Sequence, residues 1–136
     1  MTIQKTIIIK TNGRETVNIT NKINKIIADS QINIGLCNIF VKHTSASLMI
    51  TENADPDVKA DIEDYFQETI MDGNPNYRHN NEGDFDMSGH IRTILTGSST
   101  TIPITNGSLN FGIWQGLFLY EHRDGIFNRE LVITCQ

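Results

Sequence analysis

Hydrophobic and polar positions change their spacing several times along this chain, and each change marks a predicted element. Short runs rich in Ile, Val and Leu, bounded by Asn, Gly and Ser, are typical of β-strands. The run over residues 34–43 is apolar at nearly every position, which predicts a strand buried on both faces. The full set of predicted strands covers residues 3–10, 15–19, 34–43, 47–51, 100–104, 112–121 and 129–134.

Two Asn-Gly pairs mark turns between these strands. Asn12-Gly13 separates the first two runs and is the strongest short signal for a β-hairpin. Asn106-Gly107 gives the same signal between the strands predicted at 100–104 and 112–121. We therefore expect a tight turn at each pair.

Helical spacing appears in three places. Ile23, Ile26 and Ile27 share one face of a helix that Thr20 or Asn21 can cap. A third helix is predicted over 87–95 and ends at Gly97. The order of strands, then helices, then strands predicts an α+β fold, with helices packed on mixed or antiparallel sheets.

The second helix starts at Asp55-Pro56, where an Asp cap precedes Pro at the first helical position. The loop that follows it, over 71–87, is long for a compact domain and is therefore expected to have a function. The apolar face of this helix combines Val58, Ile62, Tyr65, Phe66 and Thr69.

Composition narrows the class of protein. A chain of 136 residues fits one domain over 1–136, and a net charge of −5 with a pI near 5.2 argues against nucleic-acid binding. The chain enters a strand-like run at once and has no long apolar stretch, so we expect a cytoplasmic protein with no leader and no membrane contact. Cys37 and Cys135 are then expected to be buried free thiols.

Candidate chemistry is concentrated between residues 43 and 90. This segment holds three of the four histidines and eleven of the sixteen acidic residues, against two basic ones. His43, at the mouth of a buried strand, is placed to meet a ligand or to bond a neighbouring carbonyl. Glu52 and Asn53 pair a carboxylate with an amide, which suits proton transfer or hydroxyl binding. We therefore take His43, Glu52 and Asn53 as candidate catalytic residues.

Several polar residues at element ends are candidates for substrate binding. The hydroxyls of Ser45 and Ser98, with those of Ser47 and Ser99, suit phosphate binding, although turn chemistry explains them equally well.

A second group of candidates lies on the last two long strands. Gln115 is a candidate pocket residue, and Arg129 either meets a phosphate or pairs with Glu121. Trp114 is expected in the core or at a subunit interface.

Five motifs in order along the chain resemble the YjbQ family, also called the secondary thiamine-phosphate synthase family. The motifs are His43-Thr-Ser-Ala-Ser-Leu, Glu52-Asn-Ala-Asp-Pro, Tyr77-Arg-His-Asn-Asn-Glu-Gly, Asp86-Met-Ser-Gly-His-Ile and Leu109-Asn-Phe-Gly-Ile-Trp-Gln-Gly.

This resemblance implies a fold and an activity. It implies β-sheets packed as a barrel or sandwich, assembled as a homotrimer, with a polar site built from the motifs. It also implies a weak thiamine-phosphate synthase activity, which joins a pyrimidine diphosphate to a thiazole phosphate and releases pyrophosphate. The partner would then be a phosphorylated small molecule. The alternative is a metal- or ligand-binding protein without dedicated catalysis, and a hydrolase is a distant third.

A divalent metal ion is also implied by the resemblance. His79 and His90, joined by His43, would form a nitrogen-rich site that suits zinc or another transition metal. Glu82 and Asp86 would be oxygen ligands or acceptors for the imidazole N–H groups, or would only solvate the loop. His122 lies in a segment that blends two family variants, which makes it a poor candidate for a ligand.

Overall fold

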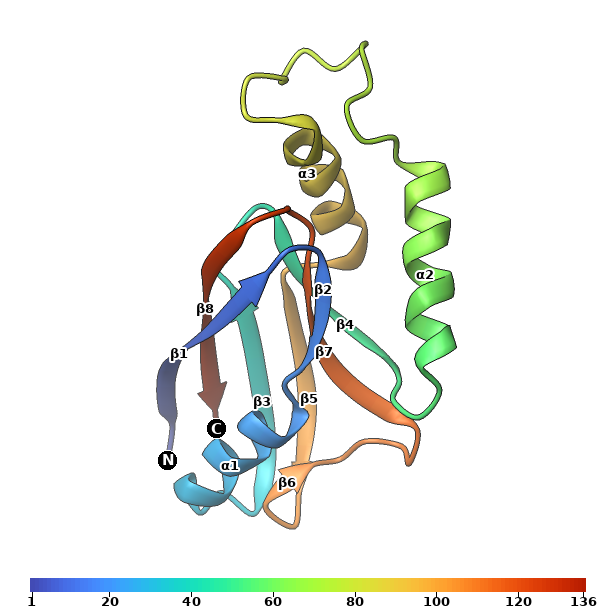
Figure 1. The fold of residues 1–136 in the computed structure, drawn as a ribbon. Helices are drawn as coiled ribbons and strands as arrows, with labels where there is room; N and C mark the ends of the chain where they lie inside the picture. The colour runs from blue at the N-terminus through green and yellow to red at the C-terminus, as the bar shows by residue number, and fades with distance from the viewer.

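The computed structural model describes residues 1–136 and has the α+β architecture that the sequence predicts (Figure 1). The strands are β1 (Ile3–Asn12), β2 (Glu15–Asn18), β3 (Ile34–Val41), β4 (Ala46–Glu52), β5 (Ser99–Thr105), β6 (Ser108–Leu109), β7 (Gln115–Glu121) and β8 (Ile126–Cys135). The helices are α1 (Thr20–Ser30), α2 (Pro56–Thr69) and α3 (Asp84–Thr96). None of the three helices is both long and apolar enough to cross a lipid bilayer.

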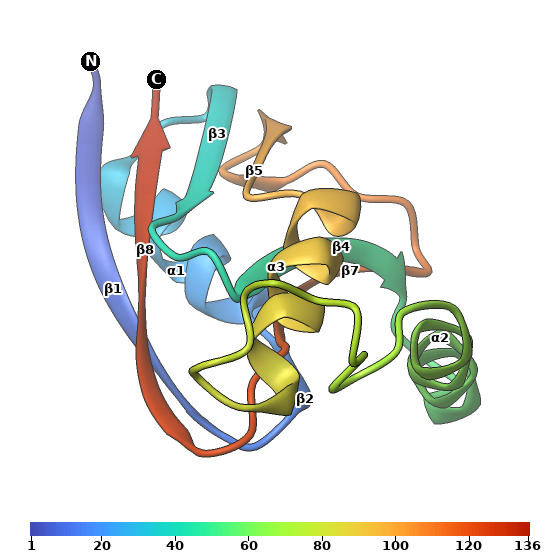
Figure 2. The ribbon, with the colours of Figure 1, turned by 90° about the horizontal axis from the view of Figure 1, so that it is seen from above.

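Two antiparallel sheets curl around α1 to form a half-barrel (Figure 2). The larger sheet has the order β1-β8-β3-β5-β6 and the smaller sheet the order β2-β7-β4. The predicted face of α1 is confirmed, because Ile23, Ile26 and Ile27 are all buried in the core between the sheets. Its predicted cap is wrong: Ile19 is the N-cap, and the side chain of Asn18 accepts the Thr20 N–H instead.

The Asn12-Gly13 turn does not form the predicted hairpin. β1 pairs with β8 along its whole length, whereas β2 pairs with β7 in the other sheet. The Gly13 N–H donates to the Gly125 carbonyl at 2.6 Å, so the turn between β1 and β2 meets the turn between β7 and β8. At each of these turns the chain passes from one sheet to the other. The Asn-Gly signal marks a sheet corner here, because the partners of these strands come from the distant C-terminus. The Asn106-Gly107 turn is confirmed, since it joins the paired strands β5 and β6.

β3 is buried on one face only, which corrects the prediction of two buried faces. Its inward side chains Cys37 and Ile39 are completely buried, but Leu36 and Phe40 on the outer face are 47% and 44% exposed. No helix covers this face in the chain, so the apolar pattern of 34–43 reflects an uncovered outer surface as well as the core. The prediction of buried free thiols is confirmed, and the Cys37 and Cys135 sulfurs are 3.6 Å apart.

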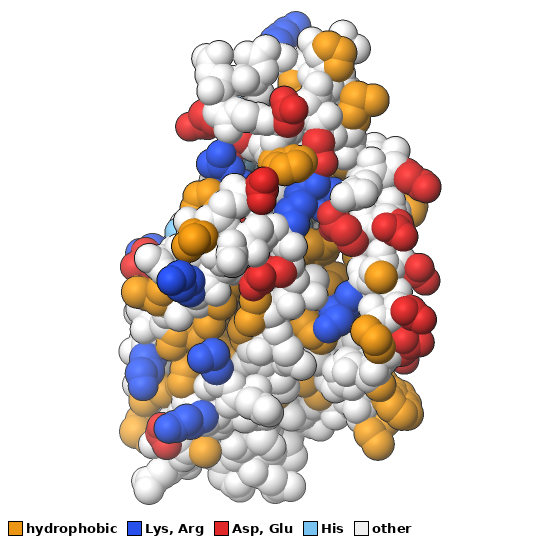
Figure 3. Space-filling model, in the orientation of Figure 1, with side chains coloured by type: hydrophobic (Ala, Val, Ile, Leu, Met, Phe, Trp, Pro, Cys, Tyr) orange, Lys and Arg blue, Asp and Glu red, His pale blue; other side chains and the backbone are white.

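The start of α2 agrees with the prediction, because Asp55 is the N-cap and accepts the Asp57 N–H. However, α2 has no buried residue and stands beside the sheets (Figures 1 and 2). Acidic side chains line it in the space-filling view (Figure 3). Glu63 attaches it to the rest of the fold, because its carboxylate accepts two hydrogen bonds from buried Arg92 and one from the Tyr120 hydroxyl.

α3 begins at Asp84, three residues before the predicted start, and ends at Gly97 as expected. Asp84 and Asp86 lie in its first turn, where acidic groups stabilise the helix N-terminus. β7 begins at Gln115, so Trp114 lies before the strand and is 60% exposed rather than part of the core. α3 and the loop before it form the top of the molecule in Figure 1 and carry two of the predicted histidines.

Candidate metal centre and adjoining pocket

His79, Asp86 and His90 converge on one point at the top of the fold. One ligand atom from each lies within 4.8 Å of the other two. The Asp86 Oδ2 atom is 2.7 Å from His79 Nε2 and 3.0 Å from His90 Nε2. Asp86 is buried and the two imidazoles are partly open to solvent. Two nitrogens and a carboxylate oxygen in this arrangement are a donor set that divalent transition metals accept.

The cluster combines a helix face with a loop. Asp86 and His90 are four residues apart on α3, so their side chains lie on the same face one turn apart. His79 reaches them from the loop between α2 and α3. The Glu82 carboxylate lies 3.2 Å from His79 Nε2 and adds an oxygen at the edge of the cluster. The predicted pair of His79 and His90 therefore comes together.

The loop that carries His79 is fixed at its base. The guanidinium of Arg14 donates two hydrogen bonds to the Asp72 carboxylate, at 2.7 and 2.6 Å. Gly73 has a φ of +61°, and a Cβ there would lie 2.7 Å from Asp84 Cγ, so glycine is required where the loop passes the start of α3. Arg123 donates to the Glu82 carbonyl at 3.0 Å near the end of the loop. These contacts position His79 over Asp86.

Electrostatics keep Asp86 ionised. Burial alone would raise the pKa of this carboxyl, but hydrogen bonding from His79 and the electrostatic interactions with His90 and Arg123 outweigh it, so its pKa lies below the usual value. Arg123 Nη1 is 3.6 Å from the other Asp86 oxygen. A carboxylate that is charged at neutral pH is the form that binds a cation.

A pocket of about 500 Å³ opens beside the cluster, and His90 belongs to both. The Thr93 hydroxyl is buried and has no hydrogen-bond partner in the protein. Five of the six lining side chains carry an imidazole or a hydroxyl group, which suits a polar ligand. The lining consists of His43, Thr44, His90, Thr93, Ile94 and Ser98.

His43 lies in this pocket but outside the metal-ligand cluster. Its Nε2 accepts the backbone N–H of Glu130 at 2.8 Å. Burial, and then the positive charge of Arg129, lower the pKa of His43, so the ring is neutral at physiological pH. His43 and Ser98 therefore line the same pocket. His43 is not one of the residues whose ligand atoms converge in the cluster, which corrects the expected three-histidine site.

Arg129 and Ser45 form part of a buried network beneath the pocket. Arg129 donates to both oxygens of the Glu121 carboxylate, at 2.7 and 2.6 Å, and to Ser45 Oγ at 3.0 Å. Thr11 donates a further hydrogen bond to Glu121. Of the two roles open to Arg129 from the sequence, the structure shows the ion pair with Glu121. Ser45 is 6% exposed and points into the same network.

Glu52, Asn53 and Gln115 lie at the opposite end of β4 from the histidines. β4 begins two residues after Thr44 and ends at Glu52, and seven extended residues span roughly 20 Å. Glu52 accepts the Asp55 N–H at 3.1 Å, and Asn53 donates to the Gln115 carbonyl at 3.0 Å. Within one chain, these three residues form a separate group that supports the start of α2 and of β7.

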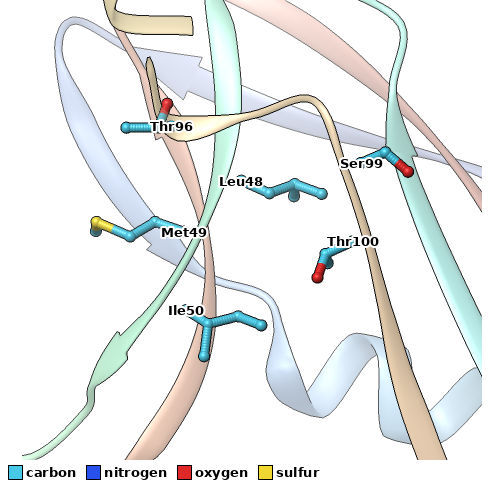
Figure 4. Close-up of a pocket in the computed structure, with 6 residues that line it drawn as sticks. All are labelled: Leu48, Met49, Ile50, Thr96, Ser99 and Thr100. Atoms are coloured by element: carbon cyan, nitrogen blue, oxygen red, sulfur yellow. The ribbon is translucent and has the colours of Figure 1, made fainter. Parts of the chain in front are cut away.

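A second pocket, of about 310 Å³, lies between β4 and β5 (Figure 4). Leu48, Met49 and Ile50 line one side, and it contains no imidazole or carboxylate. Ser99 lines this pocket, whereas its chain neighbour Ser98 lines the pocket that contains His43 and His90. Ser47 is completely buried and bonds His122 Nε2 at 2.7 Å, so neither residue contacts the pockets. This pocket is the weaker candidate for chemistry.

Sequence reasoning missed the arginines that frame the site. Arg14, Arg92 and Arg123 come from three separate segments. Arg14 pairs with Asp72 and Arg123 with the Glu82 carbonyl in the loop that carries His79, and Arg92 on α3 pairs with Glu63 of α2. No spacing in the sequence relates them. The four-residue spacing of Asp86 and His90 was the one local signal for the cluster, but the predicted helix began at residue 87 and left Asp86 outside it.

Comparison with known proteins agrees with this fold. The family model described as "UPF0047 protein YjbQ-like" matches residues 5–136. A UPF0047 protein of Synechocystis is 45% identical over 130 residues, which cover 96% of this chain and 88% of that protein. The UPF0047 protein YjbQ of Escherichia coli O157:H7 is 39% identical over 137 residues, which cover 100% of this chain and 99% of the relative.

Solved structures show the same architecture. A crystal structure of an uncharacterised YjbQ/UPF0047 protein from Clostridium acetobutylicum has a TM-score of 0.83 and 34% identity, covering 96% of this chain and 97% of that one. A YbjQ-like protein of unknown function from Sulfolobus solfataricus has a TM-score of 0.86 and 25% identity, covering 99% of this chain and 98% of that one. These names state no reaction. The sequence and the structure together show that the chain belongs to the UPF0047 YjbQ-like family.

Proposed function

We propose that this protein is a cytoplasmic, metal-dependent protein that acts on a phosphorylated small molecule. A divalent transition metal ion is held by His79, Asp86 and His90, with Glu82 as a further oxygen donor. The ligand enters the adjoining pocket. The observation that carries the proposal is the convergence of two imidazole Nε2 atoms on one carboxylate oxygen, at 2.7 and 3.0 Å.

The hydrogen bonds of His90 support a cation at this point. Its Nδ1 lies 2.8 Å from the Thr44 carbonyl oxygen, and its Nε2 lies 3.0 Å from the Asp86 carboxylate. Both neighbours are acceptors, but a neutral imidazole has only one N–H to donate. The second contact is therefore favourable only when the ring carries a second proton or when Nε2 shares a cation with the carboxylate.

The donor set also fits the metals expected from the sequence. Imidazole nitrogens with a carboxylate suit zinc and its neighbours in the first transition row, and three protein ligands leave a position open for a ligand. The Thr44 carbonyl holds the outer nitrogen of His90, as is usual for metal-binding histidines. A metal ion in this place supplies Lewis-acid stabilisation of developing negative charge.

The specific reaction that we propose to test is thiamine-phosphate synthesis. It joins a pyrimidine diphosphate to a thiazole phosphate and releases pyrophosphate, so both substrates carry phosphate groups. The pocket of about 500 Å³ lies in the size range of small-molecule sites, and its hydroxyl and imidazole groups can bind phosphate oxygens. In this scheme His43 and Ser98 bind and orient the substrate.

A second candidate is a metal- or ligand-binding protein without dedicated catalysis. The position of Glu52 and Asn53 favours it, because these predicted acid–base groups lie at the far end of β4 from the pocket. The pocket then contains no carboxylate of its own. Assay of the purified protein for thiamine-phosphate synthesis, with and without a chelator, separates the two candidates.

Metal analysis tests the centre directly. The metal-free protein would be loaded with zinc and separated from unbound zinc. Its zinc content would then be measured by inductively coupled plasma mass spectrometry. We expect about one equivalent per chain in the wild type and a loss in His79→Ala and Asp86→Asn. Asp64→Asn, on the exposed side of α2, is the matched control and should keep the metal. Equal metal content in all four proteins would exclude this site.

A further inference from the structure

The two ring nitrogens of His43 have different and fixed roles. Nε2 accepts the main-chain N–H of Glu130 at 2.8 Å. A backbone amide can only donate, so Nε2 carries no proton. The proton of the neutral ring is therefore on Nδ1. The assignment of this tautomer is unambiguous, because the partner of Nε2 is a backbone N–H, which cannot act as an acceptor.

The register of the sheet maintains this arrangement. β3 and β8 pair up to Val41 and Leu131, and the next residue, Lys42, donates to the Glu130 carbonyl at 3.1 Å. β3 ends at Val41, and the imidazole of His43 accepts the N–H of Glu130 at the end of this ladder. Rotating the ring to free Nε2 would remove the partner of a half-buried backbone donor, which is unfavourable.

Nδ1 has no partner within the chain, although the ring lines the pocket beside the cluster. Its neighbours in the lining carry hydroxyl groups, on Thr44, Thr93 and Ser98. Thr93 is 5% exposed, and its hydroxyl is also without a partner. The lining thus offers the imidazole N–H of His43 and the hydroxyls of Thr44 and Ser98, with the buried Thr93 hydroxyl beside them, and no carboxylate. This is a lining that attracts an anionic, oxygen-rich group.

We infer that His43 is a specificity-determining residue that donates its Nδ1–H to a phosphoryl oxygen of the ligand, and that it is not a metal ligand. The inference rests on the proposed function for the presence of a phosphorylated ligand in this pocket. It changes the role of His43 from candidate catalytic residue to neutral hydrogen-bond donor. The phosphoryl group belongs either to free phosphate or to a phosphate ester, and the hydrogen bonds are the same for both.

The tautomer can be measured without ligand or metal. A long-range ¹H–¹⁵N NMR spectrum of the metal-free, ¹⁵N-labelled protein at neutral pH distinguishes a protonated Nδ1 from a protonated Nε2. The His43 signals are identified by their loss in His43→Asn. We expect the Nδ1–H form. A ring protonated on Nε2, or on both nitrogens, would overturn the inference whether or not the protein binds metal.

Two variants separate the two nitrogens in binding. In His43→Asn the side-chain NH₂ lies near the position of Nδ1, whereas in His43→Gln the amide lies near the position of Nε2. Calorimetric titration would use inorganic phosphate and, in parallel, glycerol phosphate, with zinc-loaded protein. We expect the wild type and His43→Asn to agree within about threefold, and His43→Gln to bind roughly tenfold or more weakly, as for one lost charge-assisted hydrogen bond.

The outcomes distinguish this inference from the metal proposal. Zinc content is measured on every sample, and both His43 variants should keep it; loss of zinc from both would make His43 a ligand and overturn the inference. A wild-type protein that binds no zinc would reject the proposed metal centre. The NMR spectrum would still decide whether the His43 tautomer is correct. Wild-type protein that binds neither phosphate compound, or a His43→Gln protein that binds as tightly as the wild type, would also overturn it. Tighter binding of glycerol phosphate than of inorganic phosphate identifies an ester as the ligand, and the reverse order identifies free phosphate.

Discussion

His90 donates its Nδ1–H to the carbonyl oxygen of Thr44 at 2.8 Å, and this hydrogen bond fixes the ring plane on α3. Thr44 lies in the connection between β3 and β4, so the contact joins the helix to the end of both sheets. With Nδ1 held in this way, Nε2 faces Asp86. The position of one backbone carbonyl thus decides which nitrogen faces Asp86 and the proposed metal ion.

The first prediction separates these two nitrogens. In His90→Asn the side-chain amide can still donate to the Thr44 carbonyl, but nothing replaces Nε2. We expect this variant to fold and to lose at least tenfold in zinc affinity, because one of three protein ligands is gone. Competition with a fluorescent zinc chelator measures the affinity, and circular dichroism checks the fold. Zinc binding at the wild-type level would show that His90 is not a ligand.

Buried His122 predicts a loss of stability in mild acid. Burial, followed by the positive charges of Arg92 and Arg14, lowers the pKa of His122 to about 3. Between pH 6.5 and pH 3 the unfolded chain binds a proton at His122 that the folded chain does not bind. The free energy of unfolding therefore falls as the pH falls. The slope from one such group is about 1.4 kcal/mol per pH unit, or about 2 kcal/mol between pH 6.5 and pH 5.

The measurement is urea unfolding at several pH values between 7 and 5, a range that lies above the titration of most carboxyl groups. His122→Gln keeps a group that can bond Ser47 and removes the titration, so its stability should depend less on pH. His43, whose pKa is also lowered, contributes in the same direction in both proteins. Equal slopes for the wild type and the variant would contradict the prediction.

The attachment of α2 through Glu63 gives a prediction about dynamics. Phe66 packs against Tyr120 with ring centroids 6.1 Å apart, but no residue of the helix is buried. Removing the carboxylate in Glu63→Ala leaves Arg92, which is fully buried, without its acidic partner. We expect amides of 56–69 to exchange with deuterium roughly tenfold faster.

Asp64→Asn, one residue along on the exposed side of α2, is the control for this experiment and should exchange as the wild type does. Strand amides of β3 and β8 report on global unfolding in the same samples. If those strands and α2 accelerate equally, Glu63 supports the whole fold and not the local docking of the helix.

Local patterns in the sequence were sufficient for the elements but not for their partners. Asp55-Pro56 specified a helix start correctly, because capping depends only on neighbouring residues. Asn12-Gly13 specified a turn correctly but not the pairing, which depends on β7 and β8 more than a hundred residues away. The apolar run of β3 did not reveal that one of its faces is uncovered.

The same distinction holds for the candidate site. The sequence predicted the pair of His79 and His90 with Asp86 as a nearby oxygen donor. Because the predicted helix began at residue 87, only the structure shows that Asp86 and His90 lie one turn apart on α3. The ion pair of Arg129 with Glu121 replaced the phosphate contact considered for Arg129, because the two strands place these side chains opposite one another in the core. Glu52 was close to His43 in sequence, but an intervening extended strand carried it to the other end of the sheet.

The uncovered face of the larger sheet bears on assembly, for which the resemblance implies a homotrimer. Ile34, Leu36 and Phe40 project from the outer face of β3 with 76%, 47% and 44% of their surface exposed. Trp114 is a second large exposed side chain, beside the start of β7. Burying such side chains between subunits would stabilise an oligomer of this small chain.

We therefore expect a mass of about three times 15.3 kDa by light scattering. Phe40→Glu and Trp114→Ser should each shift the equilibrium toward the monomer if their surface is buried in the trimer, and Glu68→Gln on α2 should not. A wild-type monomer at all concentrations would contradict the prediction.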